Sequence, residues 1–127
     1  MKKIHVIICF LLIAGYTLHA QNTETAVINA MNSGNSGELS KYFNTNIDLF
    51  VTGNEDVYSR TQAALILKNF FNAHPVTGFS VLHKGENPEA KYVIGKLSTG
   101  NGEFRVSIFL KMQDGKLLMN KLRIENT

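Results

Sequence analysis

The chain has 127 residues, 44% of them hydrophobic and 18% charged, which suits one globular domain and not two. Its formal net charge is +3, but the basic residues form no cluster of the kind that a nucleic-acid-binding face requires. Length and charge therefore exclude a multidomain protein and predict no nucleic-acid partner.

The first 20 residues have the layout of a secretory signal peptide. Lys2 and Lys3 form a positive start, an apolar run covers residues 6–14, and polar residues then lead to Ala20. The run is too short for a membrane span, which needs about 20 apolar residues. Cys9 lies inside the run, so we predict no lipid anchor. We expect cleavage after Ala20 and export to the periplasm or the extracellular space; the alternative is a buried N-terminal strand or helix.

Residues 21–127 then form a single domain with 11 basic and 10 acidic residues and no cysteine. Its stability must come from packing, because no disulfide is available. Two short helices are expected at its start. Thr23 can cap the first, over residues 23–33, and Ser36 the second, over residues 37–43.

Residues 46–52 alternate apolar and polar side chains, which predicts a strand, and a turn leads to a brief return strand at residues 57–58. A helix follows, because Ser59 and Gln62 can form a capping box. Pro75 ends this helix by disfavouring helical backbone at the residue before it. The helix carries a broad apolar stripe of Ala63, Ile66, Leu67, Phe70 and Phe71.

Residues 79–85 and 91–125 predict four antiparallel strands. Glycine and asparagine at residues 100–102 mark one turn, whose centre is residues 100–101 or 101–102. Asp114 and Gly115 mark the next turn. With these two as its central residues, Met112 pairs with Leu117 and Leu110 pairs with Met119.

This pairing divides the last three strands into an apolar and a mixed face. The apolar face carries Val93, Gly95, Leu97, Phe104, Val106, Ile108, Leu110, Met112, Leu117 and Met119. The mixed face carries Tyr92, Ile94, Phe109, Leu118, Leu122 and Ile124 among polar residues, and Arg105 and Arg123 fall on opposite faces. Its apolar area suits a homodimer, or else coverage by the N-terminal helices. We expect the helical stripe to pack on Val106, Ile108 and Leu110, beneath a sheet that curls around it and leaves a pocket at its open end.

The order of elements resembles a known family, and so do four segments: NIDLFVTGNEDVYSRTQAALILKNFF, FSVLHKGE, YVIGKLSTGNGEFRVSIFLK and KLLMNKLRIE. The family is a group of small exported Bacteroidetes-type proteins with a domain of unknown function, similar in fold to nuclear transport factor 2 and ketosteroid isomerase. The resemblance covers about residues 22–126. It implies an α+β, cystatin-like half-barrel, in which a curved antiparallel sheet wraps on a long helix with two short N-terminal helices. It implies no reaction, because none is assigned to the family.

A reaction like that of ketosteroid isomerase needs a carboxylate base in an apolar pocket opposite an acidic donor. Asp48 and Tyr58 are the nearest candidates, although Asp48 alternates with apolar residues as a solvent-facing side chain would, and Tyr58 is placed to pack against the helix start. His83 alternates with Phe79 and Val81, which would turn it towards the pocket and allow a dehydratase-like pair with Asp48. A hydrogen-bonded structural histidine is the simpler interpretation.

We predict no cofactor and no metal site. His74 and His83 are far apart in the sequence, and a zinc site needs several convergent ligands. The glycines at residues 100–102 precede no helix, so they form no phosphate cradle.

We therefore predict a non-catalytic domain that binds a small apolar or amphipathic ligand, or a protein partner, through the half-barrel. The candidate pocket residues are Asp48, Tyr58, Phe70 and His83. One alternative is an enzyme of lyase or isomerase type with Asp48 or His83 as base. The other is a structural module that acts by dimerising.

Overall fold

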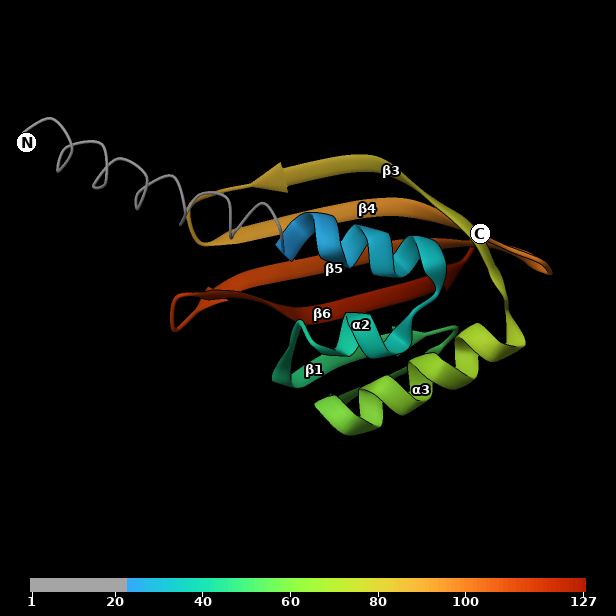
Figure 1. Cartoon of the computed structure of the whole chain (residues 1–127), viewed down its shortest axis with the longest axis horizontal. Helices are drawn as coiled ribbons and strands as arrows, with labels where there is room; N and C mark the ends of the chain where they lie inside the picture. The colour runs from blue at the N-terminus through green and yellow to red at the C-terminus, as the bar shows by residue number, and fades with distance from the viewer. Residues whose placement is uncertain (1–22) are drawn as a thin grey trace, which may run out of the picture.

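Three helices lie on one side of a curved, six-stranded sheet in the computed structural model, which describes residues 23–127 (Figure 1). The predicted α+β class is therefore confirmed. The predicted signal peptide, residues 1–20, lies outside the described residues. Within the described part of the chain, no helix combines the length and the apolar character that crossing a membrane requires.

The elements follow the predicted order. The described part of the first helix is residues 23–33, and the other elements are α2 (Ser36–Ser40), β1 (Phe43–Val51), β2 (Asn54–Ser59), α3 (Arg60–Ala73), β3 (Val76–Glu86), β4 (Ala90–Thr99), β5 (Gly102–Gln113) and β6 (Lys116–Asn126). The strands lie in the order β2-β1-β6-β5-β4-β3. Neighbouring strands are antiparallel except β1 and β6, which run parallel. The sequence pattern did not predict this parallel pair.

The second helix is shorter than the sequence predicts. It ends at Ser40, and the side chain of Asn35, not Ser36, accepts the capping hydrogen bond from the Glu38 amide at 3.0 Å. Phe43, which was expected in this helix, is instead the first residue of β1 and is fully buried. An aromatic side chain gains more from full burial in the core than a marginal helix gains from one more residue.

The ends of α3 follow from local sequence. The predicted capping box is present: the Ser59 hydroxyl accepts a hydrogen bond from the Gln62 amide at 3.2 Å, and the Gln62 side chain accepts one from the Ser59 amide. The helix ends at Ala73. His74 precedes Pro75 and has a non-helical backbone with φ −129° and ψ 80°.

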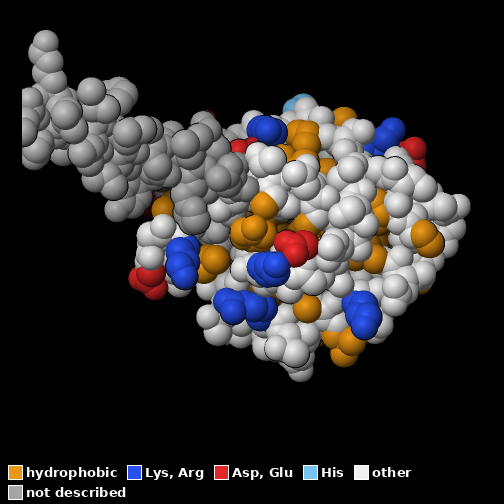
Figure 2. Space-filling view, viewed as in Figure 1, with side chains coloured by type: hydrophobic (Ala, Val, Ile, Leu, Met, Phe, Trp, Pro, Cys, Tyr) orange, Lys and Arg blue, Asp and Glu red, His pale blue; other side chains and the backbone are white. Residues whose placement is uncertain are grey.

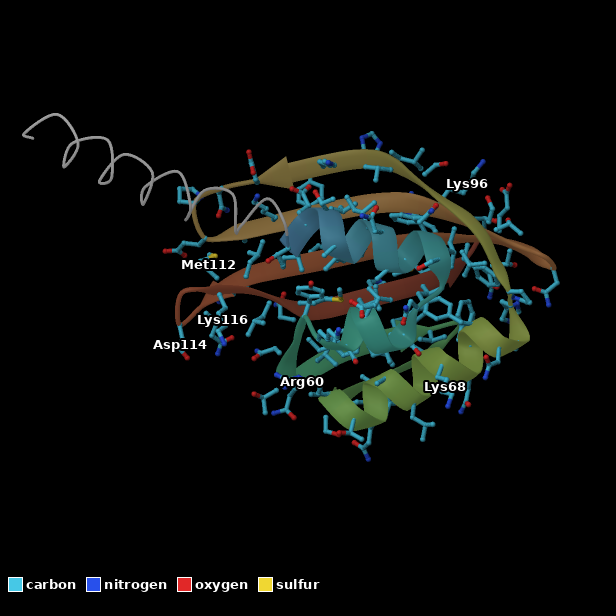
Figure 3. The ribbon with its side chains drawn as sticks, viewed as in Figure 1. Arg60, Lys68, Lys96, Met112, Asp114 and Lys116 are labelled. Atoms are coloured by element: carbon cyan, nitrogen blue, oxygen red, sulfur yellow. The ribbon has the colours of Figure 1, made fainter. Side chains whose placement is uncertain are left out.

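Two hairpins have turns of two residues with positive φ. Thr52 and Gly53 have φ of 46° and 99°, and Asp114 and Gly115 have φ of 51° and 77°. These values are typical of the type I′ turn, whose twist matches that of the flanking strands. The β5–β6 turn is labelled by its Asp114 in Figure 3 and is centred as predicted. In the β4–β5 turn the two central residues are 100 and 101, since Thr99 pairs with Gly102.

Strand β6 contains a bulge that the alternation pattern did not reveal. Leu110 of β5 pairs with Met119 as predicted, but Phe109 pairs with Lys121. Asn120 is therefore an extra residue in β6. One extra residue turns every later side chain of a strand to the opposite face.

The bulge corrects the predicted faces of β6. Leu122 and Ile124 were expected on the mixed face, but both are fully buried in the core. Arg123 pairs with Ser107 and lies on the same face as Arg105, not on the opposite one. The mixed face is consequently less apolar than the sequence pattern suggested.

A second irregularity lies in β3 and changes the position of His83. Val81 pairs with Gly95, whereas His83 pairs with Ile94, so Leu82 is the extra residue. His83 was expected on the same face of the sheet as Val81. The bulge places it with Ile94 on the face without helices, where its side chain is exposed.

The packing of α3 also differs from the prediction. Ala63, Leu67, Phe70 and Phe71 are buried as expected, and Ile66 is half-buried against the same core. However, α3 packs mainly against α2, β1 and β2, and not over Val106, Ile108 and Leu110 in the middle of β5. The helix of residues 23–33 crosses in front of β4 and β5 instead (Figure 1).

Hydrogen bonds fix these elements to one another. The Arg60 side chain, at the start of α3 (Figure 3), donates from Nε to the carbonyl oxygen of Phe43 at 3.2 Å. The Thr52 amide donates to the carbonyl oxygen of Ile124 at 2.9 Å, which holds the β1–β2 turn against β6. In the first helix, the Asn32 side chain accepts a hydrogen bond from the Phe79 amide of β3 at 2.9 Å.

The bulge at Asn120 predicts a difference between two leucines of β6. Leu122→Ala should lower the free energy of unfolding by about 2–5 kcal/mol, because it leaves a cavity in the core. Leu118→Ala removes the same atoms from a half-buried side chain on the opposite face. It should cost about 1 kcal/mol or less. Urea denaturation of both variants measures the difference, and equal losses would contradict this placement of the bulge.

Candidate functional site

An open cleft of about 730 Å³ lies between the β1–β2 hairpin and α3. It is lined by Leu49, Val51, Thr52, Gly53, Asn54, Glu55, Asp56, Tyr58, Ile66, Asn69, Phe70, Ala73 and His74. Its volume is within the usual range of sites for small molecules.

One face of α3 forms a wall of the cleft. Asn69, Phe70 and Ala73 come three, four and seven residues after Ile66, so the four lie along one side of the helix, and His74 follows at its C-cap. This side adjoins the buried stripe and shares Phe70 with it. The signal was therefore present in the sequence, but Asn69 and Ala73 drew no attention because neither is a large apolar residue.

The hairpin forms the other wall. Leu49 and Val51 lie on the core face of β1, and their side chains are buried. Tyr58 of β2 pairs with Ile47 of β1 and therefore lies on the same face. Because the turn at residues 52–53 is held against β6, the hairpin keeps its position relative to α3.

The cleft combines an apolar floor with a polar rim. Its apolar lining residues are Leu49, Val51, Ile66, Phe70 and Ala73, and its polar ones include Asn54, Asp56, Tyr58, Asn69 and His74. Apolar surface gives affinity without direction, whereas a few polar groups at fixed positions orient a bound molecule. The arrangement suits a small amphipathic molecule.

Glu55 pairs with Phe50 of β1, so its side chain lies on the face of the sheet without helices, away from the cleft, and its charge is paired there. Oε2 of Glu55 lies 3.1 Å from Nη1 of Arg123, whose Nη2 contacts Oε1 of Glu125 at 3.2 Å. The guanidinium also lies over the ring of Phe50, 4.3 Å from its centre. Asp56 is exposed, and its Oδ1 accepts a hydrogen bond from the neighbouring Val57 amide at 2.8 Å. On the side with the helices, Lys and Arg side chains are scattered among hydrophobic and uncharged ones (Figure 2).

His74 is held at the end of the cleft by the β4–β5 turn. Its Nδ1 lies 2.7 Å from Oδ1 of Asn101, whose Nδ2 donates to the carbonyl oxygen of Ala73 at 3.0 Å. The ring centre lies 4.7 Å from that of Phe70 and 5.0 Å from that of Phe104. The sequence indicated only a histidine at a helix end, because Asn101 is 27 residues further along the chain.

The structure brings Tyr58 and Phe70 together in the cleft and places the other two candidate residues elsewhere. Asp48 and His83 lie on the opposite face of the sheet, on β1 and β3. Three strands separate β1 from β3. At about 4.8 Å per step across a sheet, the two side chains are roughly 19 Å apart. They cannot form the His–Asp pair that the sequence left open.

Asp48 has an incomplete set of partners. Its Oδ2 lies 3.9 Å from Nζ of Lys121, and within the described residues its Oδ1 is buried without a hydrogen bond. This carboxylate lies beside Val57 and Lys121 on the neighbouring strands and does not line the cleft. Among residues 23–127, no three side chains of His, Cys, Asp or Glu gather as a metal site requires.

Comparison with known proteins identifies relatives over nearly the whole described chain. Residues 24–125 match the family described as Domain of unknown function (DUF4783). The crystal structure of a DUF4783 family protein from Bacteroides ovatus is similar, with 37% identity, coverage of 80% of this chain and 93% of that one, and a TM-score of 0.77. One from Bacteroides uniformis has 36% identity, covers 81% and 95%, and has a TM-score of 0.79. No curated protein matches the chain.

More distant structures show the fold alone. A domain of unknown function with a cystatin-like fold from Nostoc punctiforme has 13% identity, covers 82% of this chain and 72% of that one, and has a TM-score of 0.65. Together with neighbours of the nuclear transport factor 2 type, it shows that the expected fold type is correct.

Proposed function

We propose that this chain, which belongs to the DUF4783 family, is a non-catalytic binding module that takes a small amphipathic ligand into the cleft between the β1–β2 hairpin and α3. The observation that carries the proposal is the composition of the cleft. Its lining includes five apolar residues from β1 and α3 together with polar residues from β2 and α3. Phe70 contributes to the floor without filling the space.

The position of the candidate bases favours binding over the lyase or isomerase alternative. A base acts only when it reaches the proton that it removes, directly or through one water. Asp48 and His83 are on the face of the sheet that is turned away from the cleft. A molecule on the apolar floor is therefore out of reach of both.

A blocking substitution tests the cleft. Ala73→Phe should fill part of the floor without disturbing the core, because Ala73 is exposed and lines the cleft. The matched control is Leu65→Phe, because Leu65 is 58% exposed on α3 and does not line the cleft. With 2-methoxynaphthalene as probe, amide shifts in NMR spectra should change around Val51 and Asn69. The affinity should fall about tenfold or more in Ala73→Phe, a loss of at least about 1.4 kcal/mol, because the added ring occupies space that the probe needs. Equal binding by both variants would contradict the site.

We also propose that the face of the sheet without helices forms a homodimer. Val57 and Tyr92 are 63% and 40% exposed there, and Phe109 is half-buried at its centre. Asp48 and Glu55 on this face already pair with Lys121 and Arg123 of β6, so the exposed apolar side chains are what support the dimer.

Sedimentation tests the dimer. The wild-type protein should sediment as a dimer at about 100 µM, and Phe109→Glu as a monomer, because an unpaired carboxylate in an apolar interface is costly. Leu82→Glu, at an exposed position of the edge strand β3, should leave the dimer intact. A monomeric wild-type protein would rule out the dimer.

Export is a separate proposal, supported by the two lysines and the apolar run near the N-terminus. The intact mass of the protein from its native host should correspond to residues 21–127, which begin with Gln21. A mass that includes the apolar run would show that cleavage after Ala20 does not occur.

A further inference from the structure

The cleft has a hydrogen-bond acceptor at one end. The position of this acceptor indicates which class of ligand the cleft would select. We infer that the neutral form of His74 presents Nε2 to the cleft as an acceptor, so that the cleft selects amphipathic molecules with a hydroxyl or amine donor. This inference rests on the proposed function, since it names the ligand class of the same site. It follows from the tautomer of His74, which the neighbouring side chains determine.

The orientation of Asn101 determines that tautomer. One end of its amide meets the carbonyl oxygen of Ala73 at 3.0 Å, and a carbonyl oxygen only accepts hydrogen bonds. That end must be the NH₂ group. The amide oxygen therefore faces His74, 2.7 Å from Nδ1. Because an amide oxygen only accepts, Nδ1 carries the proton.

Asn101 is itself held in place. Its backbone amide donates to Oγ1 of Thr99 at 3.3 Å, and the Thr99 hydroxyl donates to the carbonyl oxygen of Gly102 at 2.7 Å. The Gly100 amide donates to the carbonyl oxygen of Pro75 at 2.9 Å. These bonds join the β4–β5 turn to the end of α3, and Figure 1 shows both at the same end of the molecule. The tautomer of His74 thus depends on a fixed partner.

Two aromatic rings restrict the imidazole. The ring of Phe70 lies at 34° to it and the ring of Phe104 at 73°. With Nδ1 bonded to Asn101, Nε2 is the remaining polar atom, and within residues 23–127 it has no hydrogen-bond partner. In a neutral imidazole with a proton on Nδ1, Nε2 is an acceptor. His74 lines the cleft, and with Nδ1 turned to Asn101, Nε2 is the ring nitrogen left for a donor on the ligand.

Another group on the rim favours the same class of ligand. The carboxylate of Asp56 also adjoins the cleft, because Asp56 pairs with the core residue Leu49 and lies on the same face, and an ionised carboxylate accepts hydrogen bonds without donating them. Asp56 is exposed, whereas the Glu55 carboxylate pairs with Arg123 on the face of the sheet without helices. A molecule with an apolar body and a hydroxyl or amine head therefore matches the floor and the rim together.

Two probes that differ in one donor test the inference. The compounds 2-naphthol and 2-methoxynaphthalene share the same rings, but only the first has a hydroxyl proton. The full mature protein should bind 2-naphthol about 3- to 10-fold more tightly, as expected for one hydrogen bond. In His74→Phe, which keeps an aromatic ring between Phe70 and Phe104, the two probes should bind equally. The readout is the ratio of the two affinities, because His74 lines the cleft and its replacement changes the contacts of both probes.

Asn101→Ala tests the role of Asn101 as a positioning residue. Nitrogen-15 NMR of the wild-type imidazole should show the proton on Nδ1, and in this variant the share of that tautomer should fall. The preference for 2-naphthol should fall with it, while the affinity for 2-methoxynaphthalene should not change. A merely structural role of Asn101 would weaken both probes alike and leave the tautomer as it was.

The outcomes separate this inference from the proposed function. Equal binding of the two probes by the wild-type protein, or a proton on Nε2, would overturn the acceptor role of His74 and leave the binding cleft standing. A preference for 2-naphthol that persists in His74→Phe would do the same. Failure of both probes to perturb the cleft at saturating concentration would overturn the proposed function, and the inference with it.

Discussion

The parallel pairing of β1 with β6 decides where the other elements lie. Leu49 of β1 lies beside Leu122 of β6, which adds the β1–β2 hairpin to one side of the four antiparallel strands. Because α3 follows β2 without a loop, it must pack over that added side. The helix of residues 23–33 then covers the strands that α3 leaves free. The cleft is the space between a hairpin and a helix that both depend on this one pairing.

Local signals in the sequence were sufficient for the order of elements, the class of fold and most of the turns. They failed at two bulges, for a physical reason. Around Asn120 the run Leu117, Leu118, Met119 is apolar on every residue, so either register buries a large side chain. Only the packing of Leu122 and Ile124 in the finished core selects between them. In β3 the exposed edge gives even less information, because few of its side chains are buried.

The candidate site was predictable in part. Tyr58 and Phe70 come from segments that the pattern placed correctly, and both line the cleft. The partnership of His74 with Asn101 was not predictable, because it joins a helix end to a turn 27 residues away. The fold type alone does not predict this contact either, because proteins of one fold place different side chains around the same pocket. The chemistry of this cleft therefore belongs to its own residues.

The hydrogen bond between the Asn32 side chain and the Phe79 amide protects one edge strand of the sheet against pairing with other chains. An edge strand has backbone groups that can template another chain, which leads to aggregation. On β3 the Asn32 side chain already occupies one of these groups, and the bulge at Leu82 interrupts the spacing of the next ones. The other edge strand, β2, is only six residues long and carries Glu55 and Asp56. Neither edge strand presents a long, regular row of free backbone groups to another chain. This favours a protein that resists edge-to-edge aggregation at high concentration.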